Sequence, residues 1–426
     1  MLLVQMLKLL TSSFNNMVFT HGMSFPKRSE ITPGTCIFYD LYQKDKIGHK
    51  IVSTIDCEEL DIAQTLAFIK NKARTFCKKY PHFHCRIKEK NWCKVETIDY
   101  DKMIFMMDKS KNEIMEMVLN NPLNPELPGW QFIVTTNNSI MLICDHIYGD
   151  GAFIANMIRE MFDDKSLNNL PEKREKHSIS LVSKIWLFVR ILFLIYKRFT
   201  LSKKAQVPLT PVTNKQICLA PLSLLHLKQI RDRFSCKDNT HISINDLIHT
   251  IIVKTNSLYF KKDTITSAAM FNMRENMNDL SDQNKIGYIL LANKLHDNLP
   301  ETLLGDVHEF MTFYKTTPAT LIISKIMHWY YSWDSVKACH LLKSLNKSVD
   351  FIISNYMFQY KDKHIQHGIK VLNAYGTVTP CDANQMYSVT TYGDNVNIYL
   401  TYKEPIISDV EHFRNCFDET IKWIQK

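Results

Sequence analysis

Residues 139–151 combine a possible general base with a sharp turn, and they read Ser-Ile-Met-Leu-Ile-Cys-Asp-His-Ile-Tyr-Gly-Asp-Gly. The apolar run that ends at Cys144 predicts a buried strand, and Gly149 and Gly151 predict a tight turn into a helix. His146 stands where the strand ends, so its ring can face a cleft while its backbone stays anchored. Imidazole, with an ordinary pKa of about 6.5, can take the proton of an alcohol that attacks a thioester. The segment therefore predicts a general base, and such a reaction needs no covalent enzyme intermediate.

Other interpretations of the same residues remain open. A histidine beside a turn is often only a hydrogen-bonded structural residue. Cys144 and His146 lie two apart on a strand and could share a face as a nucleophilic pair, although a buried cysteine is more often inert. A metal site built on His146 and Asp150 lacks a third ligand at a fixed spacing, so we expect no metal.

Outside this segment, the apolar pattern predicts a mixed chain in two halves. The first half shows a strand over 35–43, a helix over 58–79, a hairpin over 131–144 and a helix over 152–163. The second half shows helices over 222–234, from Ser243 and from Ser408, and strands near 216–220, 265–271, 285–293, 349–354, 368–374, 385–392 and 395–402. This mixture favours an α/β or α+β fold whose sheets are covered by helices.

Composition limits the class of partner. The 426 residues are 45% hydrophobic, which is enough for two lobes with large cores. The net charge of +9 suits anionic membranes and anionic small molecules such as coenzyme A. There is no basic tail, zinc-finger spacing or aromatic RNA-binding signature, so we expect no nucleic acid. The 11 cysteines are scattered without a Cys-x-x-Cys pair, which favours a reduced compartment.

One apolar segment indicates contact with a membrane surface. Residues 181–199 are rich in large apolar side chains, and four basic residues interrupt or flank them. Their uninterrupted runs are shorter than the roughly 20 residues of a spanning helix but suit a helix that lies in the surface. We therefore expect a membrane-associated protein on the cytoplasmic face, at the endoplasmic reticulum or a lipid droplet in a eukaryote. A helix packed between the lobes is the alternative.

Several short motifs, in order from about residue 34 to the end, resemble the wax ester synthase/diacylglycerol acyltransferase family. This family is related to condensation domains of peptide synthetases and to chloramphenicol acetyltransferase. Its motif His-His-x-x-x-Asp-Gly corresponds to 145–151, where Asp145 replaces the first histidine. Further similar elements are the Pro-Leu…Pro-x-Trp segment at 121–130, the Asn-Asp helix start at 243–246, Asn-Met-Arg at 272–274 with Asn-x-x-Gly at 284–287, Ile-Ser-Asn at 353–355, and the stretch 388–409. The family's Gly-Pro after Ser-Asn is absent, because Tyr356 and Met357 follow here.

The resemblance implies a fold and an organisation. It implies two lobes, each like a chloramphenicol-acetyltransferase subunit with a mixed sheet covered by helices, and an active-site tunnel between them. The expected divisions are an N-terminal extension at 1–33, an N-terminal lobe at 34–199, a crossover linker at 200–216 and a C-terminal lobe at 217–426.

The resemblance also implies an activity and its residues. It implies an acyl-CoA-dependent O-acyltransferase that forms wax esters or triacylglycerol from a long-chain alcohol or diacylglycerol, with acyl-CoA as co-substrate and no cofactor. His146 would be the base, supported by Asp150, Gly151 and Arg274, with Asp150 paired to Arg274. Residues expected near the substrate are Asp145, Asn245, Asn272, Ser354 and Asn355. The alternatives are a small-alcohol acetyltransferase, a condensation-type enzyme, or a non-catalytic acyl- or lipid-binding protein.

Overall fold

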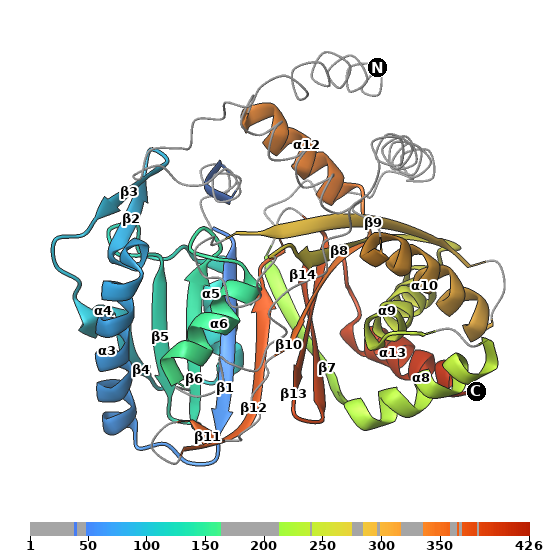
Figure 1. The fold of residues 1–426 in the computed structure, drawn as a ribbon, viewed down its shortest axis with the longest axis horizontal. Coiled ribbons are helices and arrows are strands. Elements are labelled where there is room, and N and C mark those ends of the chain that lie inside the picture. The colour runs from blue at the N-terminus through green and yellow to red at the C-terminus, as the bar shows by residue number, and fades with distance from the viewer. Residues whose placement is uncertain are drawn as a thin grey trace.

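The computed structural model describes residues 38–40, 48–162, 213–238, 241–274, 284–295, 299–316, 335–357, 364–365, 369–380 and 383–426. These residues form two lobes that lie side by side, each built around a six-stranded sheet (Figure 1). The expected extension 1–33, the segment 181–199 and residues 200–212 of the expected linker lie outside the described residues. Strand β7 already begins at Asn214, within the range expected for the linker.

The N-terminal lobe is centred on two antiparallel strands, β1 (Lys50–Cys57) and β6 (Ser139–Asp145). The sheet order is β11 (His364–Ile365), β12 (Ile369–Val378), β1, β6, β5 (Trp130–Thr135) and β4 (Ile104–Met107). Alternate residues of β1 pack on opposite faces. Ile51 and Ile55 face the core beneath helices α3 (Ile62–Lys79) and α6 (Gly151–Phe162), whereas Val52 meets α5 (Lys111–Asn120).

The C-terminal lobe has the sheet order β7 (Asn214–Ser223), β14 (Asn395–Lys403), β13 (Gln385–Tyr392), β10 (Phe351–Met357), β8 (Thr264–Asn272) and β9 (Ile286–Lys294). Four helices gather over one face of this sheet, as Figure 1 shows on the right: α8 (Leu224–Asp238), α9 (Ile244–Phe260), α10 (Pro300–Thr316) and α13 (Val410–Gln425). The remaining described elements are the 3-10 helix Pro81–His84, the hairpin β2 (Cys85–Lys88) and β3 (Asn91–Lys94), α4 (Tyr100–Met103) and α12 (Ser335–Lys347).

The N-terminal sheet is completed by a strand from the other half of the chain. Strand β12 pairs antiparallel with β1, with Ile51 opposite Val378. The backbone N–H of Val378 also donates to Ser388 Oγ on β13, at 3.2 Å, so β12 bridges the two sheets. The expected lobe boundary at residue 217 assigned β12 to the C-terminal lobe. Apolar periodicity identifies a strand but not the sheet in which it pairs.

The predicted fold class agrees with the structure, and two local predictions were wrong. Residues 38–40 are helical, although 35–43 was predicted as a strand. The last helix is capped by Asp409, which accepts from the His412 N–H, and not by Ser408. The helix expected from Ser243 begins there with a capping box, in which Ser243 and Asp246 form reciprocal hydrogen bonds.

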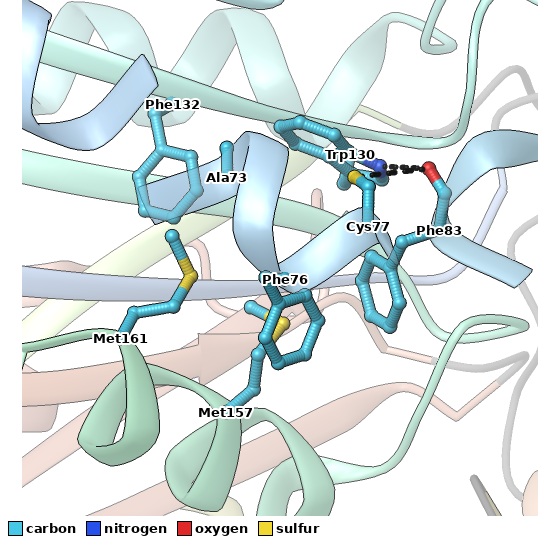
Figure 2. A pocket seen from close by; sticks show the side chains of 8 residues that line it. All are labelled: Ala73, Phe76, Cys77, Phe83, Trp130, Phe132, Met157 and Met161. Atoms are coloured by element: carbon cyan, nitrogen blue, oxygen red, sulfur yellow. Dashed lines mark hydrogen bonds between the residues drawn. The ribbon is translucent and has the colours of Figure 1, made fainter. Parts of the chain in front are cut away.

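A small apolar cavity remains in the core of the N-terminal lobe, between α3, β5 and α6 (Figure 2). Its polar neighbours are satisfied, because Trp130 Nε1 donates to the carbonyl oxygen of Phe83 at 2.9 Å. Met157 and Met161 of α6 close it from one side. No residue of the 145–151 motif lines it, so this cavity is a packing feature.

The cavity predicts a stability difference between two substitutions of one residue. Met161→Ala would enlarge the existing void and should lower the free energy of unfolding by about 2–5 kcal/mol. Met161→Leu keeps most of the volume and should cost less than about 1.5 kcal/mol. Urea unfolding followed by tryptophan fluorescence would measure both, and equal losses would show that Met161 does not border a void.

Candidate active site

His146 follows β6 directly and is buried, with 7% of its surface exposed. Its backbone N–H donates to the carbonyl oxygen of His49 at 2.6 Å. The ring of Phe38 stacks on the imidazole, with centroids 3.9 Å apart and an angle of 15° between the planes. Burial lowers the pKa of His146 below its ordinary value, because the charged form would lose its hydration. The imidazole is therefore neutral near pH 7, as a general base must be.

The side chain of Asn284 contacts the same loop from the C-terminal lobe. Its Oδ1 lies 3.1 Å from His146 Nδ1. Its Nδ2 donates to the carbonyl oxygens of His146 and Ile147, at 3.0 and 3.3 Å. The sequence motif had included Asn284 only as part of an Asn-x-x-Gly element, without a role. Its partner lies 138 positions away, and no spacing rule connects them.

Asp150 and Arg274 form a buried ion pair across the two lobes. Arg274 Nη1 lies 2.9 Å from both carboxylate oxygens, and Arg274 is 1% exposed. The same oxygens accept from the N–H groups of Phe153 and Lys285, both at 2.9 Å. Both carboxylate oxygens are thus occupied by the guanidinium, the start of α6 and the chain before β9. Asp150 therefore connects its loop to α6 and to the C-terminal lobe. Its pairing with Arg274 is the one that the family resemblance implies.

The two glycines of the motif differ in how closely neighbouring side chains approach them. A Cβ at Gly149 would lie 2.3 Å from Phe153 Cδ1, so only glycine allows this close approach. A Cβ at Gly151 would meet Tyr356 at 3.7 Å, which is an ordinary contact. Neither glycine is among the residues with positive φ, so the close approach at Gly149 explains the requirement for glycine and a left-handed turn does not.

Asp145 stabilises the turn that carries His146. Its Oδ1 accepts from the Ile147 N–H at 3.0 Å, and its carbonyl oxygen accepts from the Tyr148 N–H at 2.9 Å. Burial raises its pKa to about 6. Lys50, opposite it on β1, donates from Nζ to the carbonyl oxygen of Val118 at 2.8 Å, and burial lowers the Lys50 pKa to about 8. Asp145 therefore shapes the loop at the position where the family motif has its first histidine.

Cys144 does not have the properties of a nucleophile. It is fully buried, and burial raises the pKa of its thiol well above the ordinary value. A thiol of this kind stays protonated at neutral pH, whereas the reactive form is the thiolate. Among the described residues, no group of three His, Cys, Asp or Glu side chains is arranged to hold a metal ion.

The remaining candidate residues fall into two groups. Asn272 supports the ion pair, because its Oδ1 accepts from the Arg274 N–H at 3.0 Å. Asn245 and Asn355 bind each other, with Asn355 Nδ2 2.5 Å from Asn245 Oδ1, and Ser354 lies on β10 beside Ser388. In the described ranges, the Asn245–Asn355 pair joins α9 to β10 and makes no hydrogen bond to the loop of His146.

The fold and site together define a two-lobed α/β protein with a buried histidine at the end of a central strand. Residues 283–425 match the family model of the WS/DGAT C-terminal domain. This match and the fold confirm the resemblance seen in the motifs. No curated protein sequence matches the chain.

Solved structures share the fold over nearly the whole chain. The wax ester synthase/diacylglycerol acyltransferase of Marinobacter aquaeolei VT8 has a TM-score of 0.61 at 13% identity, covering 93% of this chain and 99% of that one. The trichothecene 15-O-acetyltransferase TRI3 of Fusarium sporotrichioides has a TM-score of 0.67 at 8% identity, covering 94% and 95%. A variant of the starter condensation domain of rhizomide synthetase, in complex with C8-CoA and Leu-SNAC, has a TM-score of 0.59 at 10% identity, covering 93% of each chain. The chain therefore shares its two-lobed fold with these proteins.

The buried ion pair predicts a loss of stability when one partner is removed. Asp150→Asn would leave Arg274 buried without its counter-charge, which should cost about 3–5 kcal/mol of unfolding free energy. The double variant Asp150→Asn/Arg274→Met removes both charges and should lose less. Asp101→Asn, which breaks the exposed pair with Lys70, should cost at most about 1 kcal/mol.

Equilibrium denaturation of the parent protein and these three variants would measure the differences in unfolding free energy. An Asp150→Asn variant as stable as the parent but inactive would instead give Asp150 a direct chemical role.

Proposed function

We propose that the protein is an acyl-CoA-dependent O-acyltransferase that transfers a fatty acyl group to a lipid hydroxyl, with His146 as the general base. The observation that carries this proposal is the buried, neutral imidazole held by Phe38, Asn284 and the backbone of His49. In the described part of the chain, its Nε2 makes no hydrogen bond, so this atom is available for a substrate hydroxyl.

The proposed reaction is a direct acyl transfer. His146 Nε2 takes the hydroxyl proton while the alcohol oxygen attacks the thioester carbonyl carbon. The resulting tetrahedral intermediate expels the coenzyme A sulfur, which receives the proton from the imidazolium as it leaves. An ester and free coenzyme A are the products. The ion pair of Asp150 and Arg274 takes no proton in this scheme and keeps the loop in place.

The WS/DGAT domain match supports a long-chain alcohol or diacylglycerol as acceptor, and wax ester or triacylglycerol as product. The condensation domain solved with C8-CoA supports acyl-CoA as the donor. The likeness to TRI3 keeps a small-alcohol acetyltransferase as the second candidate. Purified protein incubated with acyl-CoAs of several lengths and with both kinds of acceptor, and followed by thiol release, would separate the two. No thiol release with any acceptor would favour a non-catalytic acyl- or lipid-binding protein.

Removal of the base should abolish turnover without abolishing binding. His146→Ala should lower kcat by about 10²–10⁴, because that is the usual contribution of a general base. Acyl-CoA binding, measured by calorimetry, should change little. A variant with turnover near that of the parent would show that His146 is not the base.

The pH dependence follows from the direction of the His146 pKa. The neutral imidazole is the active form, so kcat/KM should fall as pH drops through the pKa of His146. Burial places this pKa below about 6.5, the value of free histidine. The midpoint of the decline should therefore lie below about pH 6.5. A midpoint above pH 7 would contradict a desolvated, neutral base.

We further propose that residues 181–199 dock the protein on anionic membranes at the cytoplasmic face. This proposal rests on the sequence, since the segment lies outside the described residues. In the described part of the chain, no helix has the length and hydrophobicity needed to cross a bilayer. The apolar residues of the segment, together with its basic residues, suit attachment to a surface.

Flotation with anionic liposomes tests this docking. Replacing Trp186, Phe188 and Phe193 by Ser should release the folded protein from the lipid fraction. Flotation equal to that of the parent would exclude the segment as the anchor, and unfolding would show that it belongs to the core.

A further inference from the structure

The amide of Asn284 is held in one orientation. Its Nδ2 lies 3.0 Å from the carbonyl oxygen of His146 and 3.3 Å from that of Ile147. Carbonyl oxygens only accept hydrogen bonds, so the amide nitrogen must face them. The amide oxygen is then the atom that faces the imidazole, 3.1 Å from Nδ1. Rotating the amide by 180° would place its oxygen against two carbonyl oxygens.

This orientation determines where the ring carries its proton. The amide oxygen of Asn284 can only accept, so Nδ1 of the neutral His146 ring must donate to it. The other ring nitrogen, Nε2, then holds the lone pair. We infer that Asn284 is a positioning residue that selects the Nδ1–H tautomer of His146 and thereby leaves Nε2 as the basic atom. The catalytic consequence rests on the proposed function, whereas the tautomer itself does not.

The same segment links tautomer selection to the contact between the lobes. Asn284 and Lys285 are consecutive, and the Lys285 N–H donates to Asp150 Oδ2 at 2.9 Å. Asp150 in turn pairs with Arg274, so two neighbouring residues hold both ends of the 146–150 loop. Among the side chains of the described residues, only that of Asn284 hydrogen-bonds to the imidazole, and the His146 backbone is the other hydrogen-bonding group that acts on the ring. The C-terminal lobe therefore supplies the group that orients a base carried by the N-terminal lobe.

A measurement without substrate tests the tautomer. Full-length protein with ¹⁵N-labelled histidine rings would give two ring nitrogen signals for His146, identified by their loss in His146→Gln. At neutral pH, Nδ1 should show the shift of a protonated nitrogen and Nε2 that of an unprotonated one. A proton on Nε2 would overturn the inference, whether or not the protein proves to be an acyltransferase.

Two variants test the catalytic consequence. Asn284→Ala should lower kcat by between about tenfold and 10⁴-fold, the larger value being the loss that a wrong histidine tautomer causes in serine proteases. The KM values should change little. Asn284→Asp would place a carboxylate at Nδ1, which favours the charged ring, so the acid limb of the pH profile should move to higher pH. A purely structural asparagine would not produce that shift.

Asn293 provides a matched control in the same lobe. It is a buried asparagine on β9, and its side-chain nitrogen and oxygen make no hydrogen bond within the described residues. Asn293→Ala should leave kcat and the pH profile unchanged. If Asn284→Ala also keeps the parent kcat and profile, or loses only thermal stability, Asn284 does not position the base. Absence of acyl transfer in the parent protein would instead contradict the proposed function and leave the tautomer to the ¹⁵N measurement.

Discussion

The buried pair of Asp150 and Arg274 is the interaction on which the site depends. Two charges without water are costly unless their hydrogen bonds are well satisfied, and here backbone N–H groups from both lobes complete the carboxylate shell. The pair therefore does two things at one point: it starts helix α6 and joins the lobes. Because Asp150 follows His146 by four residues, the position of His146 is set by the same contact that joins the two lobes.

Much of this could be predicted from the sequence, because it lies in local patterns. The strand, the turn and the helix around His146 follow from apolar runs and glycines, and the family motif implied the partnership of Asp150 with Arg274. Asn284 could be noticed as a motif residue, but its role could not be assigned, since a contact between residues 138 positions apart leaves no periodic signal. The helical turn at 38–40 was missed for a related reason: its apolar residues pack on the imidazole and on the core, and an apolar run alone does not distinguish helix from strand.

Asp145 shows how one departure from a family motif can be accommodated. A carboxylate at this position accepts a hydrogen bond from the Ile147 N–H and so makes a tight turn that supports His146. Burial of this carboxyl group raises its pKa to about 6. The positive charge of Lys50 on the neighbouring strand acts in the opposite direction and favours the ionised form. The substitution thus stays compatible with a neutral His146, because the added negative charge is close to a buried cation.

The pairing of β12 with β1 also has a consequence for biosynthesis. The backbone N–H of Lys50 donates to Thr379 Oγ1, a residue that the ribosome adds 329 positions later. Until then, one edge of β1 has exposed hydrogen-bonding groups in a nascent chain, a condition that favours pairing with other chains. A fragment ending before residue 369 would keep the His146 loop but lack both β12, which covers this edge, and β13, which carries Ser388. The N-terminal sheet is therefore complete only after β12 has been synthesised.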